Sequence, residues 1–121
     1  MLYIGQFKFV LWLAYWYLQN ESLEFEWDGG NSTKSSSKHG VDSEEVESLF
    51  NLRMGVPMGR QINPEVEEER LCMVGPTLNG KFISVVFTLR DGKVRPISSR
   101  PANKKEKLIY EEVRKTLEKI R

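Results

Sequence analysis

A run of basic side chains near the C-terminus is the part of this sequence best suited to chemistry. The candidate cations in it are Arg90, Arg95 and Arg100, followed by Lys104, Lys105 and Lys107. Guanidinium groups bind phosphates well because they stay charged and donate two parallel hydrogen bonds. On a regular strand, Arg95 and Arg100 face opposite sides of the sheet unless Pro96 introduces a bulge. The alternative interpretation is a solvated basic face.

The single histidine offers a group that could move protons. His39 follows Lys38, and a neighbouring ammonium favours the neutral imidazole, which can act as a base near pH 7. When RNA is cut without a metal, the 2′-hydroxyl attacks its own phosphodiester. A protein must then remove one proton, stabilise the phosphorane and protonate the leaving oxygen. His39 could be the base, although a lone histidine in a turn is more often structural.

Two further residues share one face of a helical stretch. Glu106 and Tyr110 are four residues apart. Glu106 could be a general base, or only the carboxylate of a capping box that opens at Asn103. Tyr110 could stack on a nucleobase or donate its hydroxyl, or it could pack in the core.

The sequence gives little support for metal or cofactor chemistry. It has one cysteine, Cys72, and one histidine, which excludes an internal disulfide and a cage of Cys or His ligands. Adjacent carboxylates on a loop diverge, so we interpret the glutamates within 65–69 as solvated or as a docking surface for a basic partner. No phosphate-binding loop or zinc-protease motif is present. We expect no metal and no cofactor, and the unpaired thiol favours the cytoplasm.

The charge of the chain is unevenly distributed. Its 121 residues suffice for one domain and carry a net charge of +1. Residues 21–70 hold 12 acidic and 5 basic side chains, whereas residues 89–121 hold 11 basic and 5 acidic ones. A basic half can attract a polyanion such as a nucleic acid, although two such faces can also attract each other.

An apolar segment precedes this domain. Residues 9–18 are all apolar or aromatic, but a membrane span needs about 20 such residues. No small-residue cleavage site follows, as a signal peptide would require. The segment could be an anchor, a signal segment, or upstream sequence included by an early start. We expect the last, with an extension at 1–22, the domain at 23–121 and no membrane contact unless residues 1–18 are translated.

Hydrophobic periodicity predicts a mixed domain with one early helix. Residues 23–27 alternate as a strand, and residues 31–38 indicate a loop or a weak helical turn. A helix begins after Asp42, with Glu45 completing a capping box and Val46, Leu49 and Phe50 buried. Glycines and prolines predict a loop over 51–64.

Strands and a last helix fill the second half of the chain. The strands at 70–74, 81–90 and 93–99 are joined by the hairpin signals Asn79-Gly80 and Asp91-Gly92. The last helix carries an apolar stripe of Ile109, Val113, Leu117 and Ile120. The order β-α-α-β-β-β-α predicts an α+β fold, a mostly antiparallel sheet with helices on one face.

Several motifs in this order resemble the BrnT family of bacterial toxins. They are FEWD (25–28), KHGV (38–41), SEEVESLF (43–50), EER (68–70) and VRPISSRPANKKEKLIYEE (94–112). The resemblance implies a small RelE-like domain and a metal-independent endoribonuclease that blocks translation. It also implies a type II toxin–antitoxin system, with a ribbon-helix-helix antitoxin as partner and operator DNA bound only through the antitoxin complex.

The resemblance also implies roles for individual residues. Those that match the family pattern are Trp27, Lys38, His39, Arg95, Arg100, Glu106 and Tyr110. By this resemblance Arg100 and Arg95 would bind phosphate and stabilise the transition state, His39 is a candidate base and Lys38 a phosphate contact. The residues themselves add Glu106 as a second candidate base. We also expect RNA-binding roles for Trp27, Arg90 and Tyr110.

Two positions depart from the family pattern. Asn31 and Ser35 replace a common lysine and asparagine, although Lys34 lies close enough to substitute for the lysine. The alternative to an active toxin is therefore a catalytically degenerate relative that binds the antitoxin and takes part in operon repression.

Overall fold

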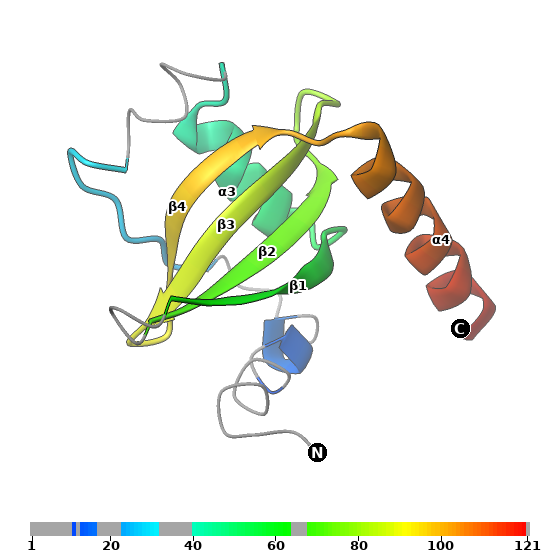
Figure 1. Ribbon diagram of the computed structural model, residues 1–121, viewed down its shortest axis with the longest axis horizontal. Helices are drawn as coiled ribbons and strands as arrows, with labels where there is room; N and C mark the ends of the chain where they lie inside the picture. Colours follow the sequence, from blue (N-terminus) through cyan, green and yellow to red (C-terminus); the bar gives the residue numbers. More distant parts are fainter. Residues whose placement is uncertain (1–10, 12, 17–22, 32–39, 64–67, 121) are drawn as a thin grey trace.

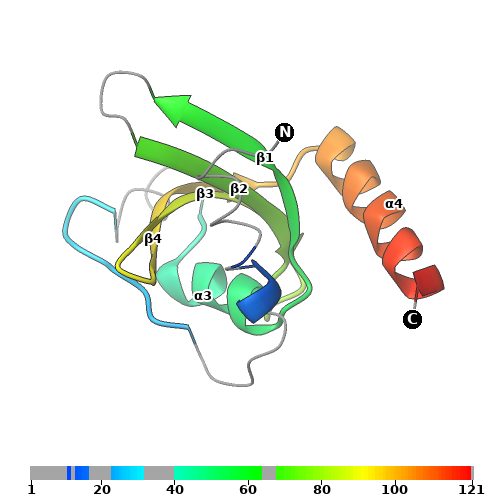
Figure 2. The ribbon, with the colours of Figure 1, turned by 90° about the horizontal axis from the view of Figure 1, so that it is seen from below.

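The computed structural model describes residues 11, 13–16, 23–31, 40–63 and 68–120. Its main elements are helix α3 (Ser43–Asn51), strands β1 (Val56–Asn63), β2 (Glu68–Pro76), β3 (Phe82–Arg90) and β4 (Lys93–Pro101), and helix α4 (Lys104–Ile120). The four strands form one antiparallel sheet in the order β1-β2-β3-β4. The sheet curves around α3, while α4 lies beside it (Figures 1 and 2). The α+β class is confirmed, and the RelE-like topology stays a prediction.

Helix α3 begins as its sequence predicts. The Asp42 carboxylate accepts a hydrogen bond from the Glu45 backbone N–H at 2.9 Å, and Glu45 Oε1 accepts one from the Asp42 N–H at 3.4 Å. This reciprocal capping box satisfies donors that a helix start otherwise leaves free. Val46, Leu49 and Phe50 are buried, as predicted.

The loop predicted over 51–64 is wrong for most of its length, because β1 begins at Val56. Strand β1 lies at an edge of the sheet, so one of its sides forms no hydrogen bonds to another described strand. A proline, which has no N–H to donate, destabilises the sheet least at such an edge. The register against β2 shifts between Pro57 and Gly59, as in a β-bulge. Glycine and proline therefore mark an irregular edge strand here and not a loop.

The strand predicted over 23–27 is reduced to a short pairing along β4. Phe25 forms a parallel bridge with Val94. The Glu26 N–H donates to Val94 O at 2.8 Å, and the Val94 N–H donates to Glu24 O at 2.9 Å. The segment that follows, predicted as a loop or weak helix over 31–38, lies outside the described residues except for Asn31.

The two hairpin turns are confirmed. Asn79-Gly80 joins β2 to β3 and Asp91-Gly92 joins β3 to β4. Asp91 and Gly92 have positive φ angles of 51° and 78°. Two consecutive positive angles are what a two-residue hairpin turn of type I′ requires, which explains the Asp-Gly sequence. The three predicted strands exist, each within a few residues of its predicted ends.

Each face of the sheet covers its own apolar cluster. On the α3 side, Leu49 and Phe50 pack with Leu71, Ile83 and other sheet residues. On the opposite side, α4 contributes Tyr110 to a smaller cluster, with the remaining members Val56, Val74 and Ala102. The prediction that the helices share one face is therefore wrong, since a strand with apolar residues on both sides needs a cover on each.

Helix α4 turns one member of the predicted stripe, Val113, toward the sheet, together with Tyr110. Tyr110 and Val113 pack on the sheet, whereas Ile109 and Leu117 are 41% and 39% exposed. A stripe buried along the whole helix needs a helix that lies flat on its support. The helix instead meets the sheet near its first turns and extends away from it (Figure 2).

Candidate functional site

A bulge in β4 brings Arg95 and Arg100 to one face of the sheet. Arg100 pairs with Ser84 and Arg95 pairs with Thr88 on β3. Residues paired across strands share a face, and so do residues an even number of positions apart on one strand. The register shifts between Val86 and Phe87, where Ile97 is the additional residue of β4. The bulge suspected beside Pro96 is thus confirmed.

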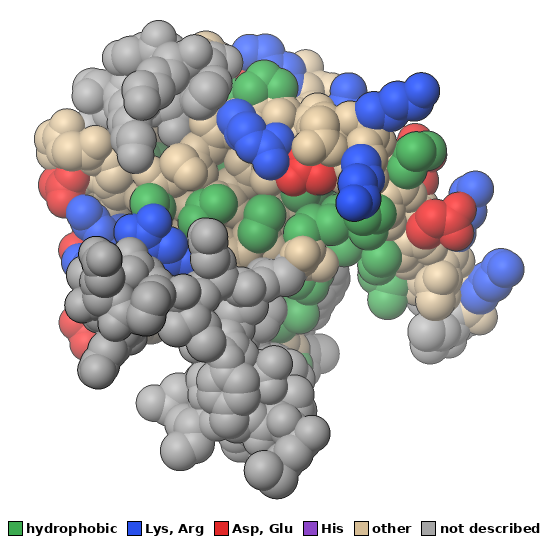
Figure 3. Space-filling model, viewed as in Figure 1, with side chains coloured by type: hydrophobic (Ala, Val, Ile, Leu, Met, Phe, Trp, Pro, Cys, Tyr) green, Lys and Arg blue, Asp and Glu red, His purple; other side chains and the backbone are tan. Residues whose placement is uncertain are grey.

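This face is the one turned away from α3. The residues between Ser84 and Thr88 alternate, and Val85 and Phe87 belong to the cluster under α3. Arg95 and Arg100 therefore project to the opposite side. On this side, Figure 3 shows basic side chains near both ends of the sheet with hydrophobic ones between them.

Arg100 is fixed by a two-pronged ion pair with Glu106. Its Nη1 donates to Glu106 Oε1 at 2.8 Å, and its Nη2 donates to Oε2 at 3.0 Å. Glu106 is itself held by the capping box, because its Oε1 accepts from the Asn103 N–H at 2.9 Å. The start of α4 thus orients the guanidinium of a strand residue, while the Arg100 side chain stays 45% exposed.

The Arg100 pair makes Glu106 a poor proton acceptor. The hydrogen bond from Arg100 is the main cause that lowers the pKa of the Glu106 carboxyl, although partial burial opposes it. A carboxylate with a lowered pKa, and with both oxygens engaged, is weakly basic. The geometry of Glu106 therefore fits the role of positioning Arg100 better than it fits the role of a general base.

We expect a pH-dependent contribution of Glu106 to stability. The pKa of Glu106 is lowered on folding, so its charged form stabilises the folded protein at pH values above 4.5, the ordinary pKa of the carboxyl. This stabilisation is lost as the pH falls from 4.5 through the lower pKa of the folded protein. The free energy of unfolding of the parent minus that of Glu106→Gln should be largest near neutral pH and shrink below pH 4.5. Urea unfolding of both proteins between neutral and acidic pH measures this difference. A constant difference across that range would contradict the prediction.

Arg95 forms ion pairs with two carboxylates of the segment at residues 23–31. Its Nη2 donates to Asp28 Oδ2 at 2.7 Å, and its Nη1 lies 3.4 Å from Glu26 Oε1. Glu26 also lies 3.9 Å from Nη1 of Arg90. The hydrogen bond from Arg95 is the main cause that lowers the pKa of Asp28. Arg95 and Arg90 thus meet at one end of the sheet, apart from Arg100.

Asn31 fastens this segment to the bulge. Its Nδ2 donates to Pro96 O at 2.8 Å and to Glu26 O at 3.1 Å, while its Oδ1 accepts from the Asp28 N–H at 2.6 Å. Asn31 is 9% exposed. The asparagine that departs from the family pattern therefore has a structural role at the residue next to the bulge.

Loss of these bonds should destabilise the protein. Asn31→Ala is expected to lower the free energy of unfolding by about 1–3 kcal/mol, because buried partners would lose their donor or acceptor. Urea unfolding measures the change. Asn51→Ala, at an exposed position at the end of α3, is the control and should change stability by less than about 0.5 kcal/mol. Equal stability of both variants would show that Asn31 does not hold the bulge.

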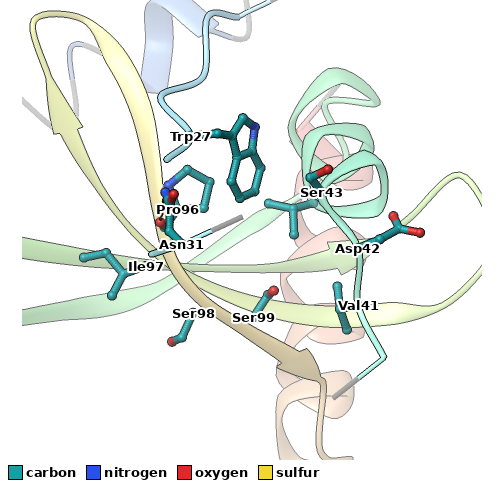
Figure 4. A pocket seen from close by; sticks show the side chains of 10 residues that line it. Trp27, Asn31, Val41, Asp42, Ser43, Pro96, Ile97, Ser98 and Ser99 are labelled. Atoms are coloured by element: carbon teal, nitrogen blue, oxygen red, sulfur yellow. Dashed lines mark hydrogen bonds between the residues drawn. The ribbon is translucent and has the colours of Figure 1, made fainter. Parts of the chain in front are cut away.

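Trp27 lies on the α3 side of β4. Figure 4 shows its ring between Pro96 and the start of α3. Its Nε1 donates to Glu47 Oε2 at 2.9 Å. The cavity beside it has a volume of about 10 Å³, too small for a nucleobase. In this arrangement Trp27 packs the segment onto the domain, and its contact with RNA stays a prediction.

The other predicted residues are placed differently. Tyr110 is 6% exposed and packs edge-on against Phe82, with ring centroids 5.1 Å apart. This agrees with the core interpretation, since the buried ring offers no face for stacking. Lys38 and His39 lie outside the described residues. Gly40 is the first described residue after them.

Arg70 belongs to the same sheet face and was not predicted as a site residue. Leu71 faces α3, so Arg70 projects to the side of Arg95 and Arg100. Arg70, Arg90 and Arg95 line an open hollow of about 270 Å³. The sequence signal was the EER motif, but only the register across three strands shows what its arginine faces.

The described residues show neither a metal-binding cluster nor a helix able to span a membrane. Within the described ranges, no group of three or more His, Cys, Asp or Glu side chains is placed to hold a metal ion. Among the helices that the structure describes, none combines the length and the apolar character that crossing a bilayer requires.

Comparison with known proteins identifies the family. A search of curated proteins found no match. A family model described as ribonuclease toxin, BrnT, of type II toxin–antitoxin system matches residues 27–106, about two thirds of the chain. The matched range includes the segment at Trp27, all four strands, the bulge and Glu106. The chain therefore belongs to the BrnT family of ribonuclease toxins of type II toxin–antitoxin systems.

Proposed function

We propose that this toxin is a metal-independent endoribonuclease that cuts RNA in the cytoplasm and thereby inhibits translation. The observation that carries the proposal is the β4 bulge, since it turns Arg95 and Arg100 to one face of the sheet. Two guanidinium groups on one face can bind phosphates of the same RNA strand at the same time. Two guanidinium groups on opposite faces of the sheet cannot.

Arg100 is the group that we place at the reacting phosphate. In the reaction, the RNA 2′-oxygen bonds to phosphorus and the bond from phosphorus to the 5′-oxygen breaks, which leaves a 2′,3′-cyclic phosphate and a 5′-hydroxyl. The charge that grows on the phosphorane oxygens is what a fixed guanidinium stabilises. Glu106 aligns Arg100 for this task through its two hydrogen bonds.

We assign proton transfer to groups other than Glu106. One proton leaves the 2′-hydroxyl and one reaches the 5′-oxygen. The neutral imidazole of His39 remains our candidate for the first, and Lys38 remains a candidate phosphate contact. Both roles rest on the sequence motif KHGV and not on observed geometry.

The antitoxin partner that the family implies is proposed to be a ribbon-helix-helix protein. In that arrangement the antitoxin supplies the contacts to operator DNA, and the toxin reaches DNA only as part of the complex. Co-expression with the product of a neighbouring gene, followed by co-purification and an operator-binding assay, tests this proposal.

One observation favours the alternative of a catalytically degenerate toxin. Both central arginines are already paired with carboxylates: Arg100 with Glu106, and Arg95 with Asp28 and Glu26. An RNA phosphate would have to compete with these carboxylates. In this alternative the chain binds its antitoxin and takes part in operon repression without cutting RNA.

Cleavage of total RNA by the purified full chain separates the two functions. We expect cleavage that persists in excess chelator and yields 5′-hydroxyl ends. Loss of cleavage in chelator, with recovery on adding a divalent cation, would contradict metal independence. No cleavage by a folded protein, free or with ribosomes present, would favour the degenerate toxin.

A further inference from the structure

We propose that Arg70, Arg90 and Arg95 form a second phosphate-binding subsite, separate from the one at Arg100. This second subsite holds a stretch of the RNA that neighbours the reacting phosphate. The proposal rests on the proposed function for the identity of its ligand. It adds Arg70, which that function did not use, and gives Arg95 a binding role away from the reacting phosphate.

The spacing along β3 separates the two positions. Arg95 is opposite Thr88, and Arg100 is opposite Ser84. Four residues of strand span about 13 Å. The two guanidinium groups also point to different anchors, since Arg95 bonds to Asp28 and Arg100 to Glu106. One phosphate cannot be shared by both in this arrangement, so each serves its own.

Arg70 contains a polar group that lacks a hydrogen bond. Its Nε is buried and, within the part of the chain that the structure describes, has no hydrogen-bond partner. A buried donor of a charged group that stays unpaired is costly, and a bound ion or water is one of the explanations for such a group. Because Leu71 pairs with Phe87, the next position places Arg70 opposite Thr88, in one row with Arg95 across three strands.

The hollow between these arginines is open and basic. Its volume is about 270 Å³, and Gly30, Asn31 and the bulge residues Pro96 and Ile97 complete its wall. Figure 3 shows basic side chains gathered at this end of the sheet. The bulge that turns Arg95 to this face therefore also shapes the wall of the hollow.

A phosphate at the hollow would compete with the carboxylates that its arginines bind. Asp28 and Glu26 pair with Arg95, and Glu26 also approaches Arg90. Within the described residues, Asp28 and Glu26 are thus carboxylates that lie against arginines of the hollow. A phosphate that binds Arg70 and displaces Asp28 from Arg95 would exchange one anion for another, with the Asp28 side chain half-exposed and able to return to water.

Binding of a short single-stranded oligoribonucleotide with 2′-O-methyl groups tests the subsite, because it keeps the phosphates but cannot be cut. Its affinity for the full chain is measured by fluorescence anisotropy at several salt concentrations. Arg70→Gln is expected to weaken binding about tenfold and to reduce the salt slope by about 0.7, the value for one phosphate contact on a single strand. Arg90→Gln, at an exposed position, should act in the same direction.

Lys115→Gln is the matched control, because it also removes one positive charge but lies exposed on α4. Arg90→Gln keeps the test valid if Arg70→Gln fails to fold. The proposal is overturned if the folded variants bind with the affinity and salt slope of the parent, if Lys115→Gln weakens binding as much as they do, or if the parent does not bind the oligonucleotide.

The outcome also separates the subsite from the proposed function. Binding that depends on Arg70 in a chain that cuts no RNA would support the subsite and reject the nuclease. Cleavage by the parent, together with unchanged binding and cleavage by Arg70→Gln, would support the nuclease and reject the subsite.

Discussion

Arg100→Ala is expected to reduce the rate of RNA cleavage by about 10²–10³-fold, the usual loss when one fixed donor to transition-state charge is removed. Arg100 is suited to this role because its guanidinium is half-exposed and fixed by two hydrogen bonds to Glu106. The measurement is the initial rate of cleavage of a labelled RNA in excess chelator. Circular dichroism must show that the variant is folded, since the pair also joins α4 to the sheet.

Two comparisons show whether the loss comes from Arg100 itself. Lys115→Ala removes a cation from an exposed position of α4 and should cut at the rate of the parent. Arg100→Lys keeps the charge but not the fork of donors, so it should recover only part of the rate. Cleavage by folded Arg100→Ala at the parental rate would remove Arg100 from the mechanism.

Glu106→Gln distinguishes a positioning residue from a base. If Glu106 only aligns Arg100, the variant is slower, by about tenfold, but its pH–rate profile keeps the parental shape. If Glu106 were the general base, the profile would lose its acidic limb. The lowered pKa of the Glu106 carboxyl favours the first outcome.

Local signals of the sequence predicted the elements whose causes are local. The capping box at Asp42 and Glu45 and the Asp-Gly turn at β4 are each decided within a few residues, and the structure contains both. Strand β1 was missed because its proline, Pro57, and its glycine, Gly59, are tolerated best at a sheet edge. No local pattern reveals which strand lies at an edge.

The arrangement of the site depends on pairing across the sheet, which the sequence does not state. Whether Arg95 and Arg100 share a face depends on one additional residue, Ile97, in the register with β3. Arg70 enters the site only because Leu71 pairs with Phe87. The stripe of α4 is correct at Val113 but not at Ile109 and Leu117 for a related reason, since the tilt of the helix decides which residues meet the sheet.

Trp16→Ala is expected to lower the free energy of unfolding by about 3–5 kcal/mol, the usual cost of emptying a buried aromatic site. Trp16 is 0% exposed and belongs to the main cluster under the sheet. Its Nε1 donates to Phe50 O at 2.9 Å, and its ring lies 6.2 Å from the Phe50 ring. Tyr15→Ala is the matched control, because the neighbouring Tyr15 is 61% exposed and its loss should cost less than about 0.5 kcal/mol.

This pair of variants also tests where the domain begins. A boundary at Leu23 stays a prediction, and it requires residues 1–22 to be dispensable for folding. Urea unfolding of the full chain decides the matter, because a large loss in Trp16→Ala beside an unchanged Tyr15→Ala means that the apolar segment completes the core around Phe50. Equal stability of Trp16→Ala and the parent would instead support the predicted boundary, with a toxin domain that folds from Leu23 onward. Since Phe50 also contacts Phe25 and Phe87, at ring distances of 5.7 and 5.0 Å, loss of Trp16 would loosen the support beneath β3, the strand opposite both Arg95 and Arg100.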